Sequence, residues 1–262
     1  ALLAAVLILL GWLWISREGG LGAGLLCAVL LFGAVMPCFL GNLYVMPVLW
    51  AGVLLGLSAA AYGFNRPLWG CGLGLAALFF RDLAGAYAVV CLVLAWRAGR
   101  HREVSCWLGG LCAYAAFFAW HIAQVQSMQS PADIAHQQSW LQYGGPRFVT
   151  STVQMNAFLL VAPQWLAGLY LVAALLGVTA WDSTAGMRGG LVLALYVALF
   201  AVVGHSFNQY WGAMLAPLFC FGAALAPGAA RRLASHCSGT RQGKLLTSPA
   251  HQARHTTQSM GQ

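Results

Sequence analysis

The chain has 262 residues, of which 61% are hydrophobic and 7% are charged, and its formal net charge is +8 at pH 7. Soluble domains carry about 25% charged residues, so the composition excludes a water-soluble domain and predicts an all-α, polytopic bundle of transmembrane helices in a lipid bilayer. The positive charge does not indicate nucleic acid, because most basic residues lie in short turns beside apolar segments. The eight cysteines form no CxxC pair, so neither a disulfide framework nor a metal site is expected.

About nine membrane segments follow one another along the chain. They span residues 1–15, 21–36, 48–62, 68–80, 83–96, 107–122, 156–180, 189–203 and 211–226. The chain opens at Ala1 inside an apolar run, so we expect residues 1–230 to be a transmembrane domain whose N-terminal part is missing. Residues 231–262 are rich in Ser, Thr, Gln, His and basic residues, which predicts a disordered, basic cytoplasmic tail.

Arg81 and Asp82 stand between the fourth and fifth segments. One helix across both segments would place two charges in hydrocarbon, at roughly 2.5–3.5 kcal/mol each, so we expect two short helices that meet at a membrane face. One interpretation is a pair of residues that anchors the helix ends at the membrane interface and whose charges neutralise each other. The other is functional: Arg81 grips a phosphate bidentately, and Asp82 serves as the catalytic base or as a metal ligand. A requirement for a divalent metal is left open.

The basic residues predict the orientation of the chain. If every segment crosses once, eleven basic residues fall on one side and only Arg81 and Arg147 on the other. By the positive-inside rule the larger set is cytoplasmic, and so is the C-terminus. The expected location is therefore a plasma or inner membrane. The larger set consists of Arg17, Arg66, Arg97, Arg100, Arg102, Arg188, Arg231, Arg232, Arg241, Lys244 and Arg254.

The non-cytoplasmic side would hold the turn 37–47, the Arg81-Asp82 junction, the loop 124–154 and the turn 204–210. Within the loop, Ser130-Pro131-Ala132-Asp133 has the pattern of a helix start, and Tyr143-Gly144-Gly145-Pro146 that of a stop. We therefore expect a short helix on the membrane surface. In the seventh segment, Pro163-Gln164 predicts a kinked helix with a polar side chain at depth.

The turn between the last two segments carries an unusual set of polar and aromatic residues: His205, Asn208, Gln209, Tyr210 and Trp211. Aromatic faces pack on sugar rings while amides and imidazole reach hydroxyls, so the set is typical of a sugar or head-group site. The alternative is an aromatic belt beside a polar turn, in which His205 is a hydrogen-bonded structural residue.

From residue 48 to 102 the chain has an apolar helix, an Asn65-Arg66-Pro67 turn, a Gly-rich helix, Phe80-Arg81-Asp82, a helix with Tyr87 and a basic turn. Near the end, Asn208-Gln209-Tyr210-Trp211 is followed by Ala216-Pro217. This pattern resembles the later transmembrane part of the multi-pass GT-C glycosyltransferases, including the protein mannosyltransferase-like and arabinose-transferase-like branches.

The resemblance implies that a sugar is moved from a polyprenyl-phosphate carrier to an acceptor on the non-cytoplasmic face. Arg81 would then hold the carrier phosphate, and the residues of the 205–211 turn would line the pocket. The principal catalytic Asp of that family lies in its first external loop, but the 37–47 turn contains no acid. Asp82 and Asp133 are therefore the remaining candidates for the catalytic carboxylate.

Two other functions remain open. Short helices that meet at Arg81-Asp82 also resemble the interrupted helices of transporters, so a transporter or flippase for a lipid-linked or small polar substrate is the alternative. The third is a scaffold subunit of an envelope complex.

Overall fold

A computed structural model describes residues 1–130 and 142–246, and in these ranges all regular secondary structure is helical, as the composition predicts. The α-helices are α1 (Leu2–Gly19), α2 (Leu21–Val35), α3 (Pro47–Gly63), α4 (Pro67–Phe80), α5 (Gly85–Arg97), α6 (His101–Met128), α7 (Gly145–Val153), α8 (Gln164–Thr179), α9 (Thr184–Val202) and α10 (Gly212–Leu246). Short 3-10 helices are η1 (Met36–Phe39), η2 (Asp82–Ala84) and η3 (Ser206–Trp211).

Five helices within the described ranges are long and apolar enough to cross a membrane: α1, α2 with η1, α6, α9 and the part of α10 near the bundle. This supports the prediction of a membrane protein. Helices α3, α4 and α8 are apolar but shorter. The nine predicted segments match α1–α6 and α8–α10, while nine separate crossings stay a prediction.

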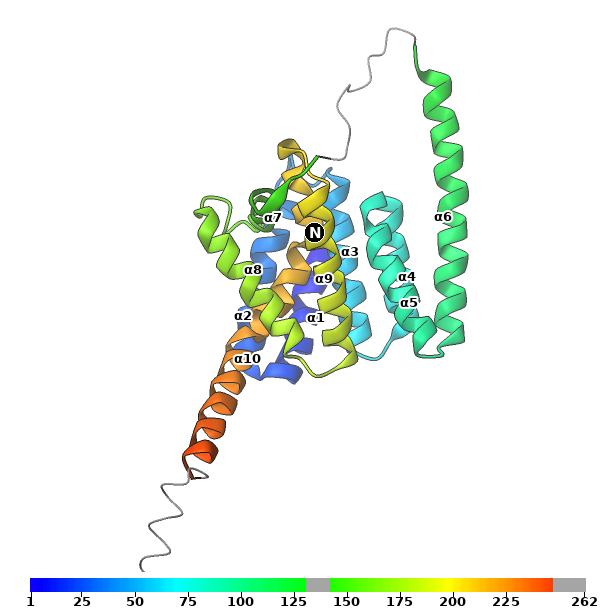
Figure 1. Cartoon of the computed structure of the whole chain (residues 1–262). Helices are drawn as coiled ribbons and strands as arrows, with labels where there is room; N and C mark the ends of the chain where they lie inside the picture. Colours follow the sequence, from blue (N-terminus) through cyan, green and yellow to red (C-terminus); the bar gives the residue numbers. More distant parts are fainter. Residues whose placement is uncertain (131–141, 247–262) are drawn as a thin grey trace, which may run out of the picture.

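The helices turn at two ends of the bundle (Figure 1). We call one the basic end: it holds the α1–α2, α3–α4, α5–α6 and α8–α9 junctions, and α10 leaves the bundle there. We call the other the Arg81 end: it holds the α2–α3, α4–α5 and α9–α10 junctions and α7. The predicted grouping of the junctions is thus confirmed. Which side of a membrane each end faces stays a prediction.

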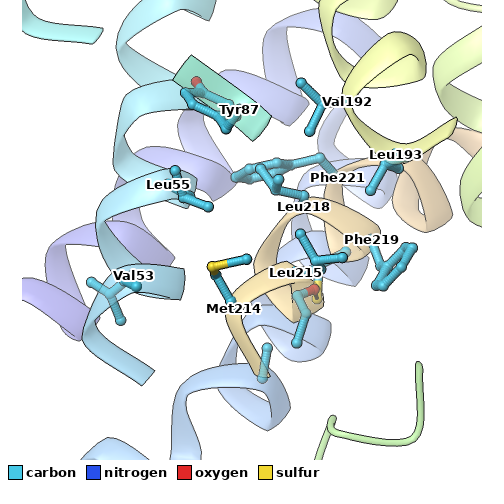
Figure 2. Close-up of a cluster of buried hydrophobic side chains, with 14 of the residues drawn as sticks. Val53, Leu55, Tyr87, Val192, Leu193, Met214, Leu215, Leu218, Phe219 and Phe221 are labelled. Atoms are coloured by element: carbon cyan, nitrogen blue, oxygen red, sulfur yellow. Dashed lines mark hydrogen bonds between the residues drawn. The ribbon is translucent and has the colours of Figure 1, made fainter. Parts of the chain in front are cut away.

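Helix α10 is the centre of the bundle and α6 is its edge. In the most apolar stretch of residues 207–235, which includes the start of α10, 83% of the residues are buried. In the most apolar stretch of α6 only 6% are buried. Figure 2 shows Met214, Leu215 and Leu218 of α10 among side chains of α3 and α9. Gly177 of α8 lies against the backbone of α10, where an added Cβ would overlap the Gly222 carbonyl. Small residues therefore let α8 and α10 approach closely.

The predicted break at Arg81 is confirmed. Helix α4 ends at Phe80, Arg81 has an extended backbone (φ −153°, ψ 119°), and α5 begins at Gly85. The 14 residues of α4 span about 21 Å, less than the roughly 30 Å of a hydrocarbon core. Two short helices therefore meet at one end of the bundle and keep Arg81 and Asp82 out of its middle.

The prediction of one kinked helix over the seventh segment is wrong. No kinked helix covers 156–180; α8 begins at Gln164, directly after Pro163. Proline lacks a backbone N–H and fits a helix start better than a helix interior. Ahead of it, Asn156 is buried and its Nδ2 donates to the Leu30 carbonyl at 2.9 Å. This side-chain bond ties an irregular segment to α2.

The residues between 131 and 141, which include Asp133 and most of the expected surface helix, lie outside the described residues. Residues 142–144 are not helical, and Gly145 and Pro146, which were expected to end that helix, begin α7. Proline suits the first turn of a helix as well as the position after one. The apolar residues Phe148, Val149 and Val153 then bury one face of α7.

The expected domain boundary at residue 230 is not visible in the backbone. Helix α10 continues through Arg231 and Arg232 to Leu246, so half of the segment expected to be disordered is helical. Leucine, arginine and lysine, which make up seven of the residues 231–246, favour helix. Residues 247–262 lie outside the described part of the chain.

Candidate functional site

The Arg81 end brings two predicted site residues together that are 129 positions apart. The guanidinium Nη2 of Arg81 donates to the hydroxyl of Tyr210 at 3.3 Å, and its carbon lies 5.8 Å from the centre of that ring. Asp82 Oδ1 is 3.8 Å from Arg81 Nε. The Asp82 side chain is 60% exposed, which leaves its carboxylate open to solvent or to a ligand.

Local sequence explains how η3 reaches this place. Helix α9 ends at Val202, and Gly204 follows at a point where an added Cβ would overlap the ring of Phe148. Only glycine fits this close approach. The Gly204 amide also donates to the Gln142 carbonyl at 3.0 Å, so the segment before α7 and the start of η3 are joined.

An open depression of about 530 Å³ lies where this segment, α7, α8 and η3 meet. It is lined by Gln142, Tyr143, Gly144, Arg147, Phe148, Ser151, Gln164, Gly204 and Gln209. Gln164 Nε2 donates to Ser151 Oγ at 3.2 Å, which orders two of its polar side chains. Arg147 is exposed, and no carboxylate among the described residues forms an ion pair with it.

Gln209 and Tyr210 connect this depression with the Arg81 corner. They are neighbours in a 3-10 helix, where successive side chains point about 120° apart. Gln209 therefore lines the depression while Tyr210 contacts Arg81. A guanidinium that has no ion-pair partner in ranges 1–130 and 142–246, together with amides and a hydroxyl in one open space, can bind an anion or a group rich in hydroxyls.

Three predicted pocket residues are buried. His205, Asn208 and Trp211 are only 8%, 2% and 6% exposed. Trp211 packs edge-on against Phe148 and tilted against Phe200, at centroid distances of 6.5 and 6.0 Å. These three side chains support η3 from inside, while the Nδ2 of Asn208 has no hydrogen-bond partner among the described residues.

Sequence reasoning missed Arg147, Ser151 and Gln164 as candidates. Arg147 had been counted only for topology, although it is one of two basic residues on its side. Its position one residue after a Gly-Gly-Pro helix start was the available signal. The polar side chain expected at depth, Gln164, instead lies at the start of α8 and faces this depression.

A second polar cluster was also missed, at the basic end. Glu103 Oε1 accepts a hydrogen bond from the Tyr62 hydroxyl at 2.7 Å and lies 3.8 Å from Arg188 Nη2. Trp107 Nε1 donates to the same hydroxyl at 3.2 Å, and Arg100 Nε lies 3.1 Å from Glu103 Oε2. Arg188, expected in a junction, is instead buried inside α9. This cluster joins α3, α6 and α9.

Among the described residues no group of three or more His, Cys, Asp and Glu side chains is placed to hold a metal ion. Asp133, a candidate for the catalytic carboxylate, lies outside those residues.

The chain matches no protein-family model, no curated protein and no solved structure. The function is therefore argued from the geometry of the Arg81 end.

Proposed function

We propose that this chain is the multi-pass membrane core of a glycosyltransferase that moves a sugar from a polyprenyl-phosphate carrier to an acceptor. In this proposal the Arg81 end faces away from the cytoplasm and the C-terminus is cytoplasmic. The observation that carries it is the meeting of Arg147 and Gln209 in one open depression beside the Arg81–Tyr210 pair.

The charges support this assignment of roles. Arg147 has no described carboxylate partner, so its guanidinium is available for a phosphate, which it can grip with two parallel hydrogen bonds. Arg81 is already held by Asp82 and Tyr210, and it positions that corner. Gln209, Gln164 and Ser151 are suited to sugar hydroxyls, because amides and hydroxyls both donate and accept.

Asp82 is the candidate general base. Among the described residues it is the only carboxylate at the Arg81 end, since Glu18, Glu103 and Asp182 lie at the basic end. A base must remove the proton of the acceptor hydroxyl as that oxygen attacks the sugar carbon. The exposed carboxylate of Asp82 has room for an acceptor beside it.

The direct test is sugar transfer by the full chain in proteoliposomes, with polyprenyl-phosphate mannose, glucose and arabinose as donors. Loss of a charge-assisted hydrogen bond costs about 1.5–3 kcal/mol, so Arg147→Ala is expected to slow transfer about 10- to 100-fold. Asp82→Asn is expected to slow it as well. Arg97→Ala removes an exposed charge from the basic end and is the matched control, with wild-type transfer expected.

The broken helix pair at Arg81 is the observation that favours a transporter or flippase instead. The same proteoliposomes distinguish the two. A transferase leaves the sugar covalently attached to an acceptor, whereas a flippase moves the intact lipid-linked sugar between leaflets. Movement without transfer, at normal rates in Asp82→Asn, would contradict the enzyme proposal.

A further inference from the structure

Helix α6 buries side chains in the bundle at its start, residues 101–107, which we call its foot. It has 28 residues and spans about 42 Å, but its buried residues are Glu103 and Trp107, both within its first two turns. Both contact the hydroxyl of Tyr62 on α3. In Figure 1, the rest of α6 stands beside α4 and α5 at the edge of the molecule. Beyond the foot, α6 contacts α4 through the ring of Phe79, which lies 5.4 Å from that of Tyr114 and 5.5 Å from that of Phe117. A change at the foot therefore bears on the packing of the first turns of α6.

Two cysteine thiols meet at this foot. Cys106 lies on α6 between Glu103 and Trp107, and its Sγ is 2.7 Å from the Sγ of Cys71 on α4. Cys71 is fully buried, whereas Cys106 is half-buried. Cys112, one and a half turns further along α6, is exposed.

We propose that Cys71 and Cys106 are a redox-responsive pair that forms a disulfide between α4 and α6. The oxidant is a peroxide or a low-molecular-weight disulfide. With a peroxide, the more accessible Cys106 thiol is oxidised to a sulfenic acid and one water is released. The Cys71 thiol then attacks that sulfur, so the S–S bond forms and a second water leaves. Two thiols and one hydrogen peroxide thus give one disulfide and two waters.

The location of the two cysteines suits a disulfide that forms reversibly and regulates the protein. Cys71 and Cys106 lie near the basic end, which the proposed orientation places at the cytoplasm. The cytoplasm keeps thiols reduced, and disulfides that form there are mostly transient and redox-sensing. The pair therefore rests as two thiols and closes under oxidative load, and closure fixes the foot of α6 to α4. Disulfide formation itself does not depend on the glycosyltransferase proposal.

The test treats the purified full chain with hydrogen peroxide or a membrane-permeable aromatic disulfide, alkylates the remaining thiols and maps peptides by mass spectrometry. The expected product is a peptide linking Cys71 to Cys106, lighter by about 2 Da than its two reduced halves and lost on reduction. Cys112→Ala on the same helix is the matched control and keeps this product. Cys106→Ala, a small change at a half-buried site, abolishes it.

Hydrogen exchange tests the mechanical part in the same samples. After oxidation, amides in the first turns of α6 are expected to exchange more slowly in the wild type and unchanged in Cys106→Ala, whose melting temperature verifies that it is folded. Full alkylation of both Cys71 and Cys106 after oxidation, or a disulfide between other cysteines, would overturn the pairing. A Cys71–Cys106 disulfide with unchanged exchange in α6 would overturn the fixing of the helix.

Discussion

The two ends of the bundle use charged side chains in opposite ways. At the basic end, Glu103 and Arg188 are 2% and 6% exposed and face each other and Tyr62. At the Arg81 end, Arg147 is exposed and lines the open depression, and the Asp82 side chain is 60% exposed. Helices enclose the Glu103–Arg188 pair, whereas the side chains of Arg147 and Asp82 are each accessible to a ligand.

This difference separates structure from function in a chain with few charges. Breaking a buried ion pair is costly, because it leaves an uncompensated charge away from water. Exposed charges contribute about 0–1 kcal/mol, so they can be changed at little cost to the fold. We therefore expect substitutions in the buried Glu103–Arg188 cluster of the basic end to affect folding, and substitutions of the exposed charges at the Arg81 end to affect activity. Four predictions test this comparison, in order of decreasing effect on stability.

The largest effect is expected for Glu103→Ala. It leaves Arg188 buried without its carboxylate and should lower the free energy of unfolding by about 3–5 kcal/mol. Denaturant unfolding of the purified protein in detergent measures it. Glu18→Ala is the control, since Glu18 is exposed and only accepts a hydrogen bond from Trp181, and about 1 kcal/mol or less is expected there. An equal loss of unfolding free energy in the two variants would contradict the expected difference between buried and exposed acids.

A double substitution, Glu103→Leu with Arg188→Met, should be more stable than Glu103→Ala by about 2 kcal/mol or more. Apolar residues of similar volume replace a buried ion pair at little net cost. The single variants Glu103→Leu and Arg188→Met, measured beside the double variant in the same unfolding assay, give the coupling energy between the two residues. A double variant no more stable than Glu103→Ala would show that a buried Arg188 without its carboxylate costs no stability.

Tyr62→Phe removes one hydroxyl that donates to Glu103 and accepts from Trp107. The expected loss of stability is about 1–3 kcal/mol, because two buried polar groups lose their partner. Tyr44→Phe, an exposed tyrosine, should leave the unfolding midpoint unchanged. A midpoint shift of the same size in both variants would mean that the hydroxyl of Tyr62 adds nothing to the cluster.

The smallest change in stability is expected for Arg147→Ala, within about 0.5 kcal/mol of the wild type. The same variant should show the large loss of sugar transfer expected above. Thermal unfolding and the transfer assay on one preparation give both values. If Arg147→Ala unfolds as easily as Glu103→Ala, the Arg81 end is structural too and the comparison of the two ends fails.

Local signals explain which parts of the fold were predictable. The charge pair at Arg81-Asp82 predicted two short helices correctly, since charges in hydrocarbon are costly. Pro67 begins α4 after Asn65 in a left-handed turn, as the Asn65-Arg66-Pro67 sequence suggests. Proline elsewhere was ambiguous: Pro146 and Pro163 fit a helix stop or a kink as well as the helix starts they make.

The candidate site was only half predictable. The turn at 205–211 was recognised by its residue types. The sequence could not say that Gln209 lines the depression and Tyr210 contacts Arg81 while Asn208 and Trp211 are buried. In a 3-10 turn of mixed polar and aromatic residues every face has similar chemistry. The neighbouring helices decide which face is covered.

By themselves, composition and the order of charges predicted a helical chain with apolar helices long enough to cross a membrane and with basic junctions that share one end. These properties follow from local hydropathy and from the alternation of helices along the chain. Only the tertiary structure decided that Glu103 meets Arg188, that Cys71 meets Cys106 and that Arg147 shares a depression with Gln209. The reason is physical: burial and pairing of a side chain depend on which helix packs opposite it, and helices far apart in sequence supply those partners.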